Sequence, residues 1–126
     1  EWARRKSLQV VFVPYNGFTC SKYKMAYPTI QEWLFYIDHA EYVITDSFHC
    51  SLFSILFNKK LGVVKALSKE IGTNLRFDSL FEITGVDARY IYNGCYDELE
   101  KPVQVFDRNH ITESLPSLDE FLAKVN

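Results

Sequence analysis

Residues 42–58 contain a histidine, His49, just after an apolar segment and a short polar turn. These residues predict a short strand at 42–45, a turn formed by Asp46 and Ser47, and an apolar helix that carries His49 in its first turn. The first helical turn has backbone N–H groups without partners inside the helix, and together with the helix dipole they attract anions. A histidine at this place can bind a phosphate or a carboxylate, or transfer a proton to a bound molecule.

A purely structural interpretation of the same residues stays open at this point. Asp and Ser are common capping residues at the start of a helix, and a single histidine in such a turn is often just a solvated polar group. The function of His49 therefore depends on which other groups lie at this end of the predicted helix.

Strand and helix patterns alternate along the chain. Apolar runs predict strands, and apolar residues three and four positions apart predict helices. Thr29 and Glu32 form a capping box, and Gly85 ends a helix. The expected strands are residues 8–13, 42–45 and 61–64, with weaker candidates at 90–92 and 103–106. The expected helices are residues 29–39, 47–57, 75–84 and a terminal one from residue 117, with residues 1–6 as the end of another. Residues 14–28, 93–102 and 107–116 predict loops.

This alternation predicts a parallel sheet with right-handed crossovers and helices on both faces, a three-layer Rossmann-like α/β fold. Ligands bind such sheets at the carboxyl ends of the strands. Asp46, Ser47 and His49 follow one predicted strand, and a polar loop at 65–74 follows the next, so the pattern alone predicts a site at this edge. The helix at 47–57 is apolar on nearly all sides and is expected to be buried.

The composition argues against several classes of function. The chain has 126 residues, of which 48% are hydrophobic and 16% aromatic, enough for the core of one domain. A formal charge of −2 argues against electrostatic binding of nucleic acid or of a membrane surface, and no apolar run reaches the ~20 residues of a membrane-spanning helix. Cys20, Cys50 and Cys95 lack the spacing of a zinc site, so we expect reduced thiols in a cytoplasmic protein and no metal.

Residues 41–60 resemble the signature segment of the polysaccharide pyruvyl transferase family, whose members often read Tyr-Val-Ile-Thr-Asp-Ser-Phe-His-Gly at this place. The resemblance extends upstream through Thr-Ile-Gln-Glu-Trp-Leu at residues 29–34. Downstream it continues through Gly72 and through Arg-Phe-Asp-Ser-Leu-Phe at residues 76–81 to Gly85. It therefore runs from residue 29 to residue 85, and the segment at 41–60 is its most specific part.

The resemblance implies an enzyme that transfers a pyruvyl group from phosphoenolpyruvate to sugar hydroxyls, forming a ketal during polysaccharide or exopolysaccharide biosynthesis. The partners are then phosphoenolpyruvate as donor substrate and a saccharide acceptor, with no further cofactor. The resemblance also implies that residues 1–126 form one truncated domain, the C-terminal Rossmann-like half of a two-domain glycosyltransferase-B-like fold. We expect an N-terminal domain of the same protein to complete the cleft and the chain alone to be inactive. The apolar helix at 47–57 also favours homo-oligomers.

The resemblance assigns roles to individual residues of this chain. His49 and Asp46 are the candidate catalytic residues: His49 binds the donor and transfers protons, and Asp46 orients His49 or polarises a sugar hydroxyl. Ser47, Arg76 and Gly72 are the candidate substrate-binding residues. Ser47 caps the helix or bonds a phosphate oxygen, and Arg76 clamps an anionic group.

Two of these residues have structural alternatives. Arg76 can instead form a surface ion pair with Asp78 or Glu70. Asp46 can serve only as a turn or capping residue. The sequence does not choose between these roles.

Two departures from the family pattern leave other functions open. Cys50 replaces the glycine that follows the histidine in the family, and Ile71 replaces an arginine that often precedes Gly72. A degenerate homologue that acts by binding or assembly is therefore one alternative. A nucleotide-sugar glycosyltransferase with two Rossmann-like domains is another, since that architecture also binds phosphates at helix N-termini, and Glu70 is its candidate for a ribose contact.

Overall fold

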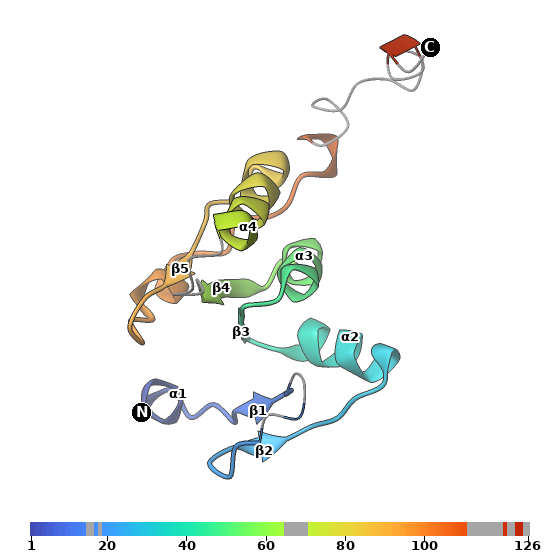
Figure 1. Cartoon of the computed structure of the whole chain (residues 1–126). Coiled ribbons are helices and arrows are strands. Elements are labelled where there is room, and N and C mark those ends of the chain that lie inside the picture. Colours follow the sequence, from blue (N-terminus) through green and yellow to red (C-terminus); the bar gives the residue numbers. More distant parts are fainter. Residues whose placement is uncertain (15–16, 18, 65–70, 111–119, 121–122, 125–126) are drawn as a thin grey trace.

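A parallel sheet of three strands, in the order β3-β4-β5, forms the centre of the computed structural model (Figure 1). A second, two-stranded parallel sheet pairs β1 with β2. The structure describes residues 1–14, 17, 19–64, 71–110, 120 and 123–124. Within these ranges, no helix combines the length and the apolar character that crossing a membrane requires.

The elements follow one another as the predicted alternation requires, with short additions. In chain order they are α1 (Trp2–Arg5), β1 (Val11–Phe12), β2 (Lys24–Met25), α2 (Ile30–His39), β3 (Tyr42–Thr45), α3 (Phe48–Leu56), β4 (Lys60–Val64), α4 (Ile71–Thr84), β5 (Tyr90–Ile91) and the 3-10 helix η1 (Asp97–Glu100). This mixed α/β arrangement with parallel sheets is consistent with a Rossmann-like fold.

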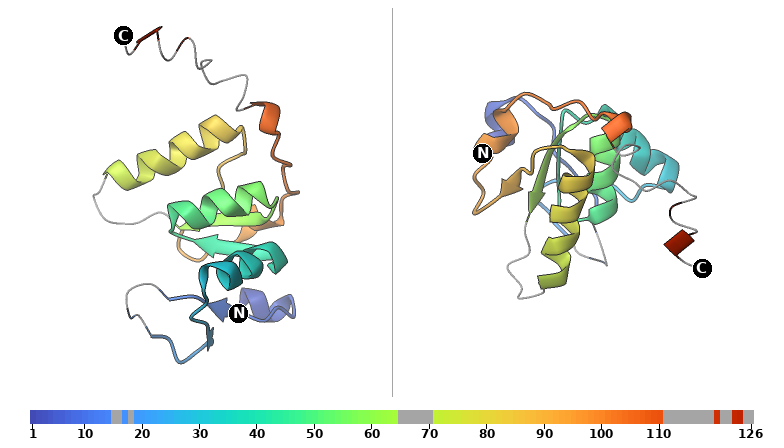
Figure 2. Two further views of the ribbon diagram at one scale, coloured as in Figure 1. Left: turned by 90° about the vertical axis from the view of Figure 1, so that its right-hand side faces the viewer. Right: turned by 90° about the horizontal axis from the view of Figure 1, so that it is seen from above.

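The main core lies between the sheet and the helices α3 and α4. Alternate residues of β4, Leu61 and Val63, turn toward these helices, and Val63 is fully buried. Figure 2 shows α3 and α4 on the same side of the sheet. The buried members of this core are Ile55, Leu61, Val63, Phe77, Leu80 and Phe81.

The opposite face of the sheet is covered by η1 and α1. A Cβ built on Gly62 of β4 would lie 2.6 Å from Ile91 Cδ1 and 3.0 Å from Leu99 Cδ2, so a glycine allows η1 to pack closely there. Trp2 of α1 packs edge-on against Tyr42 of β3, with ring centroids 4.9 Å apart. Two layers of helix therefore enclose the sheet, as expected for this fold class.

Local sequence signals place the helix ends correctly. The predicted capping box is confirmed, because Glu32 N donates to Thr29 Oγ1 at 3.3 Å and Thr29 N donates to Glu32 Oε2 at 2.7 Å. Just beyond α3, Asn58 adopts a positive φ of 55°, which ends the helix. Gly85 does the same after α4, with φ of 66°.

The prediction for the first strand was wrong in its length and its partner. Residues 8–13 contribute only β1, and β1 pairs with β2 rather than joining the sheet of β3 and β4. The predicted loop at 14–28 accordingly contains β2. An apolar run predicts that a strand is buried, but it does not specify which segment supplies the hydrogen-bonding partner.

Other boundaries also differ from the prediction. Helix α4 begins at Ile71 instead of residue 75, so the polar loop after β4 is shorter than expected, and its residues 65–70 lie outside the described part. Residues 103–106 form no strand, because side chains rather than a neighbouring strand hold them. Asn58 Oδ1 accepts from Phe106 N at 2.8 Å, and Gln104 Nε2 donates to Gly85 O at 2.8 Å.

Two helix predictions have mixed outcomes. Helix α3 is confirmed, but only Ser51, Ser54 and Ile55 of it are buried, while its large apolar side chains are half-buried. Its fully buried face carries two serines whose hydroxyls bond the carbonyl oxygens four residues earlier. The predicted terminal helix lies mainly outside the described residues.

Replacing Gly62 by alanine is predicted to destabilise the fold by about 1–3 kcal/mol, because the new methyl group overlaps Ile91 and Leu99. Val64→Ala, on the same face of β4 but 38% exposed, is the control and should cost less than ~1 kcal/mol. Urea unfolding measures both values. A Gly62→Ala protein as stable as the wild type would show that η1 does not pack on this face.

Candidate functional site

The turn between β3 and α3 is held by side-chain hydrogen bonds on both of its sides. Thr45, the last residue of β3, accepts a hydrogen bond at its Oγ1 from Ser47 N at 3.0 Å. Ser47 is the N-cap of α3, and its Oγ accepts from Cys50 N at 3.4 Å. Ser51 Oγ donates to Ser47 O at 2.9 Å. The predicted capping role of Ser47 is thus present, and the start of α3 has a defined geometry.

This capping leaves two backbone donors at the start of α3. Of the first three helical amides, that of Cys50 is bonded to Ser47, and no hydrogen bond within the described part of the chain occupies those of Phe48 and His49. These two N–H groups lie at the positive end of the helix dipole. The turn after β3 can therefore offer an anion two adjacent donors.

His49 is exposed at this end of α3 and is free to meet a ligand. Its ring lies edge-on to the ring of Phe48, with centroids 5.9 Å apart. Asp46 is also exposed, but among the described residues no hydrogen bond joins it to His49. The two residues share the turn, and the predicted orientation of His49 by Asp46 stays a prediction.

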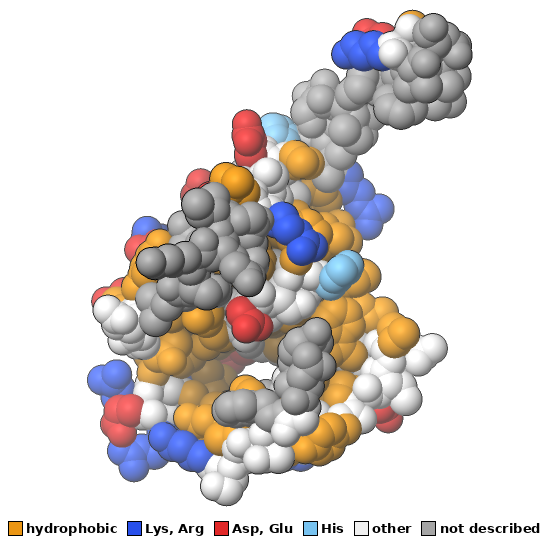
Figure 3. All heavy atoms as spheres, in the orientation of Figure 1, with side chains coloured by type: hydrophobic (Ala, Val, Ile, Leu, Met, Phe, Trp, Pro, Cys, Tyr) orange, Lys and Arg blue, Asp and Glu red, His pale blue; other side chains and the backbone are white. Residues whose placement is uncertain are grey.

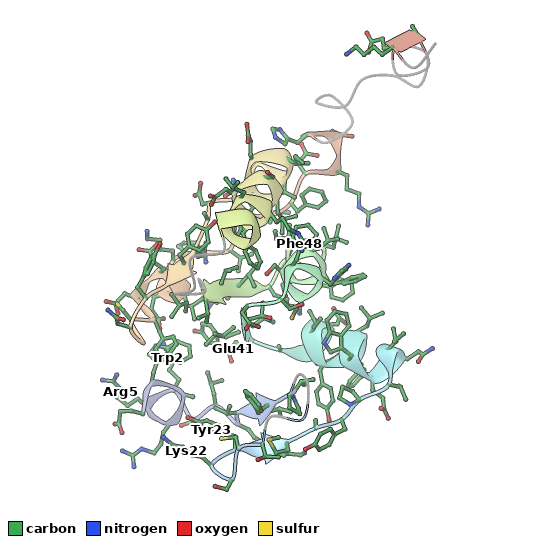
Figure 4. All side chains as sticks on the ribbon, in the orientation of Figure 1. Trp2, Arg5, Lys22, Tyr23, Glu41 and Phe48 are labelled. Atoms are coloured by element: carbon green, nitrogen blue, oxygen red, sulfur yellow. The ribbon has the colours of Figure 1, made fainter. Side chains whose placement is uncertain are left out.

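Arg76 comes to the same place from the neighbouring helix α4. Its Cζ atom lies 4.8 Å from the centre of the Phe48 ring, and the label in Figure 4 marks Phe48 at the start of α3, facing α4. A cation from one helix and a histidine from another therefore both contact a single aromatic ring. The fold thus brings His49 and Arg76, which are 27 positions apart in the sequence, to the same ring.

The alternative role of Arg76 as an ion-pair partner of Asp78 does not occur in the structure. The Asp78 carboxylate instead accepts a hydrogen bond from the Tyr90 hydroxyl. Among the residues that the structure describes, no carboxylate forms an ion pair with Arg76, and Glu70 lies outside them. Among the described residues, the contact that the structure shows for the Arg76 guanidinium is the one with the ring of Phe48.

A shallow groove between α3 and α4 runs away from this cation. Its walls are mainly apolar, and Figure 3 shows hydrophobic side chains exposed on this face of the molecule with cationic ones among them. Leu75 is 58% exposed and Ile83 is 47% exposed at the surface of α4. The groove is lined by Phe48, Leu75, Arg76, Ser79, Leu80 and Ile83.

The thiol of Cys50 is turned inward, toward the side chains of Thr45 and Ser54. Burial raises the pKa of this thiol, and the charge of Asp46 acts in the same direction, while the hydrogen bonds with Thr45 and Ser54 oppose them. The thiol is therefore protonated at neutral pH. These properties are those of a packed cysteine rather than of a nucleophile.

Gly72 lies within the first turn of α4, next to Ile71, at the carboxyl edge of the sheet. The sequence predicted a loop at these positions, so that part of the prediction was wrong. A glycine near the start of a helix that follows a parallel strand lies where ligands bind in such folds. Its predicted contact with a substrate stays a prediction.

Sequence reasoning missed two residues that organise the site. Thr45 was interpreted only as the end of a strand, and Phe48 only as one of many apolar residues of α3. The position of Phe48, directly before the histidine in the first helical turn, was the one available signal. Its contact with Arg76 depends on how α3 and α4 pack, which no local pattern reports.

The comparisons with known proteins agree with the predicted resemblance. A family model described as polysaccharide pyruvyl transferase matches residues 4–65, a range that includes β3, the turn and α3. No curated protein and no solved structure matches the chain significantly. Across the described ranges, no three His, Cys, Asp or Glu side chains are grouped so that they could hold a metal ion.

The inward position of Cys50 predicts slow alkylation. A raised thiol pKa lowers the fraction of thiolate, which is the reactive form, so Cys50 should react with iodoacetamide several times more slowly than the exposed Cys95 at neutral pH. Proteins that retain one cysteine each, followed by mass spectrometry, measure the two rates. In urea the rates should become similar. Equal rates in the folded protein would place the Cys50 thiol at the surface.

Proposed function

Because residues 4–65 belong to the polysaccharide pyruvyl transferase family, we propose that this chain supplies the donor-binding half of an enzyme that transfers a pyruvyl group. The donor is phosphoenolpyruvate, and the acceptor is a pair of hydroxyls on a saccharide of a polysaccharide or its precursor. The product is a cyclic ketal. The observation that carries the proposal is the meeting of Arg76 and His49 at the ring of Phe48, beside two amides of α3 that bond no group in the described part of the chain.

The donor sets clear chemical requirements. Phosphoenolpyruvate carries a phosphate and a carboxylate, so its site needs cationic groups and N–H donors. Arg76 offers a planar set of N–H groups that suits either anion. The amides of Phe48 and His49 offer two more donors at the positive end of α3. No described carboxylate competes for the guanidinium group, which supports its use by a ligand.

The reaction also requires proton transfer. A proton is delivered to the methylene carbon of the donor, which leaves an oxocarbenium-like centre at the neighbouring carbon. A sugar hydroxyl attacks that centre, phosphate leaves, and a second hydroxyl closes the ketal. His49 is exposed at the donor end of α3, and an imidazole ring is the side chain that most often transfers protons in catalysis. In this scheme Asp46 polarises a sugar hydroxyl or orients His49, Ser47 bonds a phosphate oxygen, and Gly72 lets the backbone of α4 approach the donor.

The acceptor side of the cleft is proposed to come from an N-terminal domain of the same protein. The chain would then be the C-terminal domain of a glycosyltransferase-B-like pair, with the donor held at the carboxyl edge of the β3-β4-β5 sheet. The exposed apolar side chains beside this edge, such as Leu75, fit a surface that another domain or a second copy covers. A nucleotide-sugar transferase would bind its nucleotide-sugar donor at the same edge. The two donors must therefore be compared directly.

His49→Ala is predicted to lower turnover of the full-length protein with phosphoenolpyruvate by ~10²–10⁴, the usual contribution of a proton-transferring side chain. The matched control is His39→Ala. His39 is also exposed, but it lies at the end of α2, where its Nδ1 is hydrogen-bonded to Phe35 O at 3.0 Å and lies near Asp38. Release of phosphate measures the rate. Unchanged turnover in His49→Ala would remove this residue from the mechanism, and turnover with a nucleotide sugar instead would replace the proposed donor.

Ile71→Arg is predicted to tighten phosphoenolpyruvate binding, because it restores the arginine that the family often has before Gly72. One charge-assisted hydrogen bond contributes ~1.5–3 kcal/mol. Adding Cys50→Gly should contribute little more, since the thiol already turns inward toward Thr45 and Ser54. Calorimetry on the full-length protein measures the affinities. Weaker binding by the arginine variant would mean that this chain binds its donor with a different geometry.

A further inference from the structure

Phe48 lies at the meeting point of the site and the core. One side of its ring faces Arg76, whose Cζ is 4.8 Å from the ring centre. Its neighbour His49 meets the ring edge-on at 5.9 Å between centroids. Phe77, which is almost fully buried in α4, lies 6.3 Å away between centroids. Phe48 is therefore anchored by the hydrophobic core while it contacts both Arg76 and His49.

The geometry of a guanidinium group over a ring has a chemical consequence. A guanidinium group that stacks on a ring does so through its flat face, and its N–H donors then point outward in its plane. A stacked arginine therefore keeps its donor edge free for a carboxylate or a phosphate. An unsupported arginine on an exposed helix surface would instead sample many rotamers, and a ligand would have to order it at an entropic cost.

We propose that Phe48 is a positioning residue that holds the guanidinium of Arg76 in the orientation needed to bind the anionic groups of the donor. This inference rests on the proposed function for the identity of the donor, but the contact itself does not. Phe48 acts through Arg76 and touches no reacting atom. It thereby links the packing of α3 against α4 to the affinity for the donor, since the ring belongs to α3 and the cation to α4.

An aromatic side chain has a property here that an aliphatic one of similar size lacks. The negative potential of the ring face attracts the cation, at a partly exposed site by an amount equivalent to about a two- to fivefold change in an equilibrium constant. Leucine would keep most of the apolar packing on Phe77 and lose this attraction. Tyrosine would keep both.

The test compares Phe48→Leu with Phe48→Tyr in the full-length protein. Phe48→Leu should raise the KM for phosphoenolpyruvate about two- to fivefold with little change in kcat, and Phe48→Tyr should restore the wild-type value. Phe35→Leu is the matched control, because Phe35 stacks on His39 at 3.8 Å between centroids, away from the site. Thermal unfolding of the three variants verifies folding. Equal effects of leucine and tyrosine, or no effect of leucine, would overturn the inference.

A double-mutant cycle and an NMR measurement separate this inference from the proposed function. In an Arg76→Gln background, Phe48→Leu should have no further effect on donor binding, since the group that it positions is gone. Without any donor, the side-chain resonances of Arg76 should lose their ring-current shift in Phe48→Leu. Arg76 resonances at the same positions in Phe48→Leu and in the wild type would overturn the inference. If the Arg76 resonances change in Phe48→Leu but the wild-type protein does not bind phosphoenolpyruvate, the positioning role stands and the proposed donor is wrong.

Discussion

The parallel pairing of β3 with β4 determines where the two helices of the site begin. The register pairs Tyr42 with Lys60 and Thr45 with Val63, so both strands end at the same edge of the sheet. Helix α3 follows β3 after a two-residue turn, and α4 follows β4 at this edge. Because both helices lie on the same face, the first turn of α3 and the second turn of α4 are close enough for Arg76 to reach Phe48. Losing this pairing would separate Gly72 and Arg76 of α4 from the candidate residues in the turn before α3.

The site is built on the rim of the hydrophobic core rather than on a separate loop. Phe77 is nearly fully buried, Phe48 is half-buried, and His49 is exposed, so burial decreases step by step from the core to the candidate catalytic residue. Rigid elements position side chains more accurately than loops do. The hydroxyl of Ser51 also ties the turn to α3, which further limits the motion of the residues that precede His49.

Cationic side chains make different contacts at the two ends of the sheet. Near the amino ends of the strands, Lys6 pairs with Glu100 at 2.8 Å, and Lys60 lies 4.7 Å from the centre of the Tyr42 ring. The first contact joins the end of α1 to η1, and the second joins β4 to β3. At the carboxyl end, Arg76 has only an aromatic contact and no ion pair among the described residues. The first arrangement is suited to stability, and the second leaves a charge for a ligand.

Short-range chemistry in the sequence was sufficient to predict β3, the capped start of α3 and the capping box of α2, because each depends on residues within four positions of one another. The most specific part of the resemblance to pyruvyl transferases was likewise contained in one contiguous segment, residues 41–60. Only the tertiary structure decided that β1 pairs with β2, that α4 starts at Ile71, and that Phe48 contacts Arg76. Those outcomes depend on which surfaces pack together, and an apolar or charged residue does not carry the identity of its distant partner.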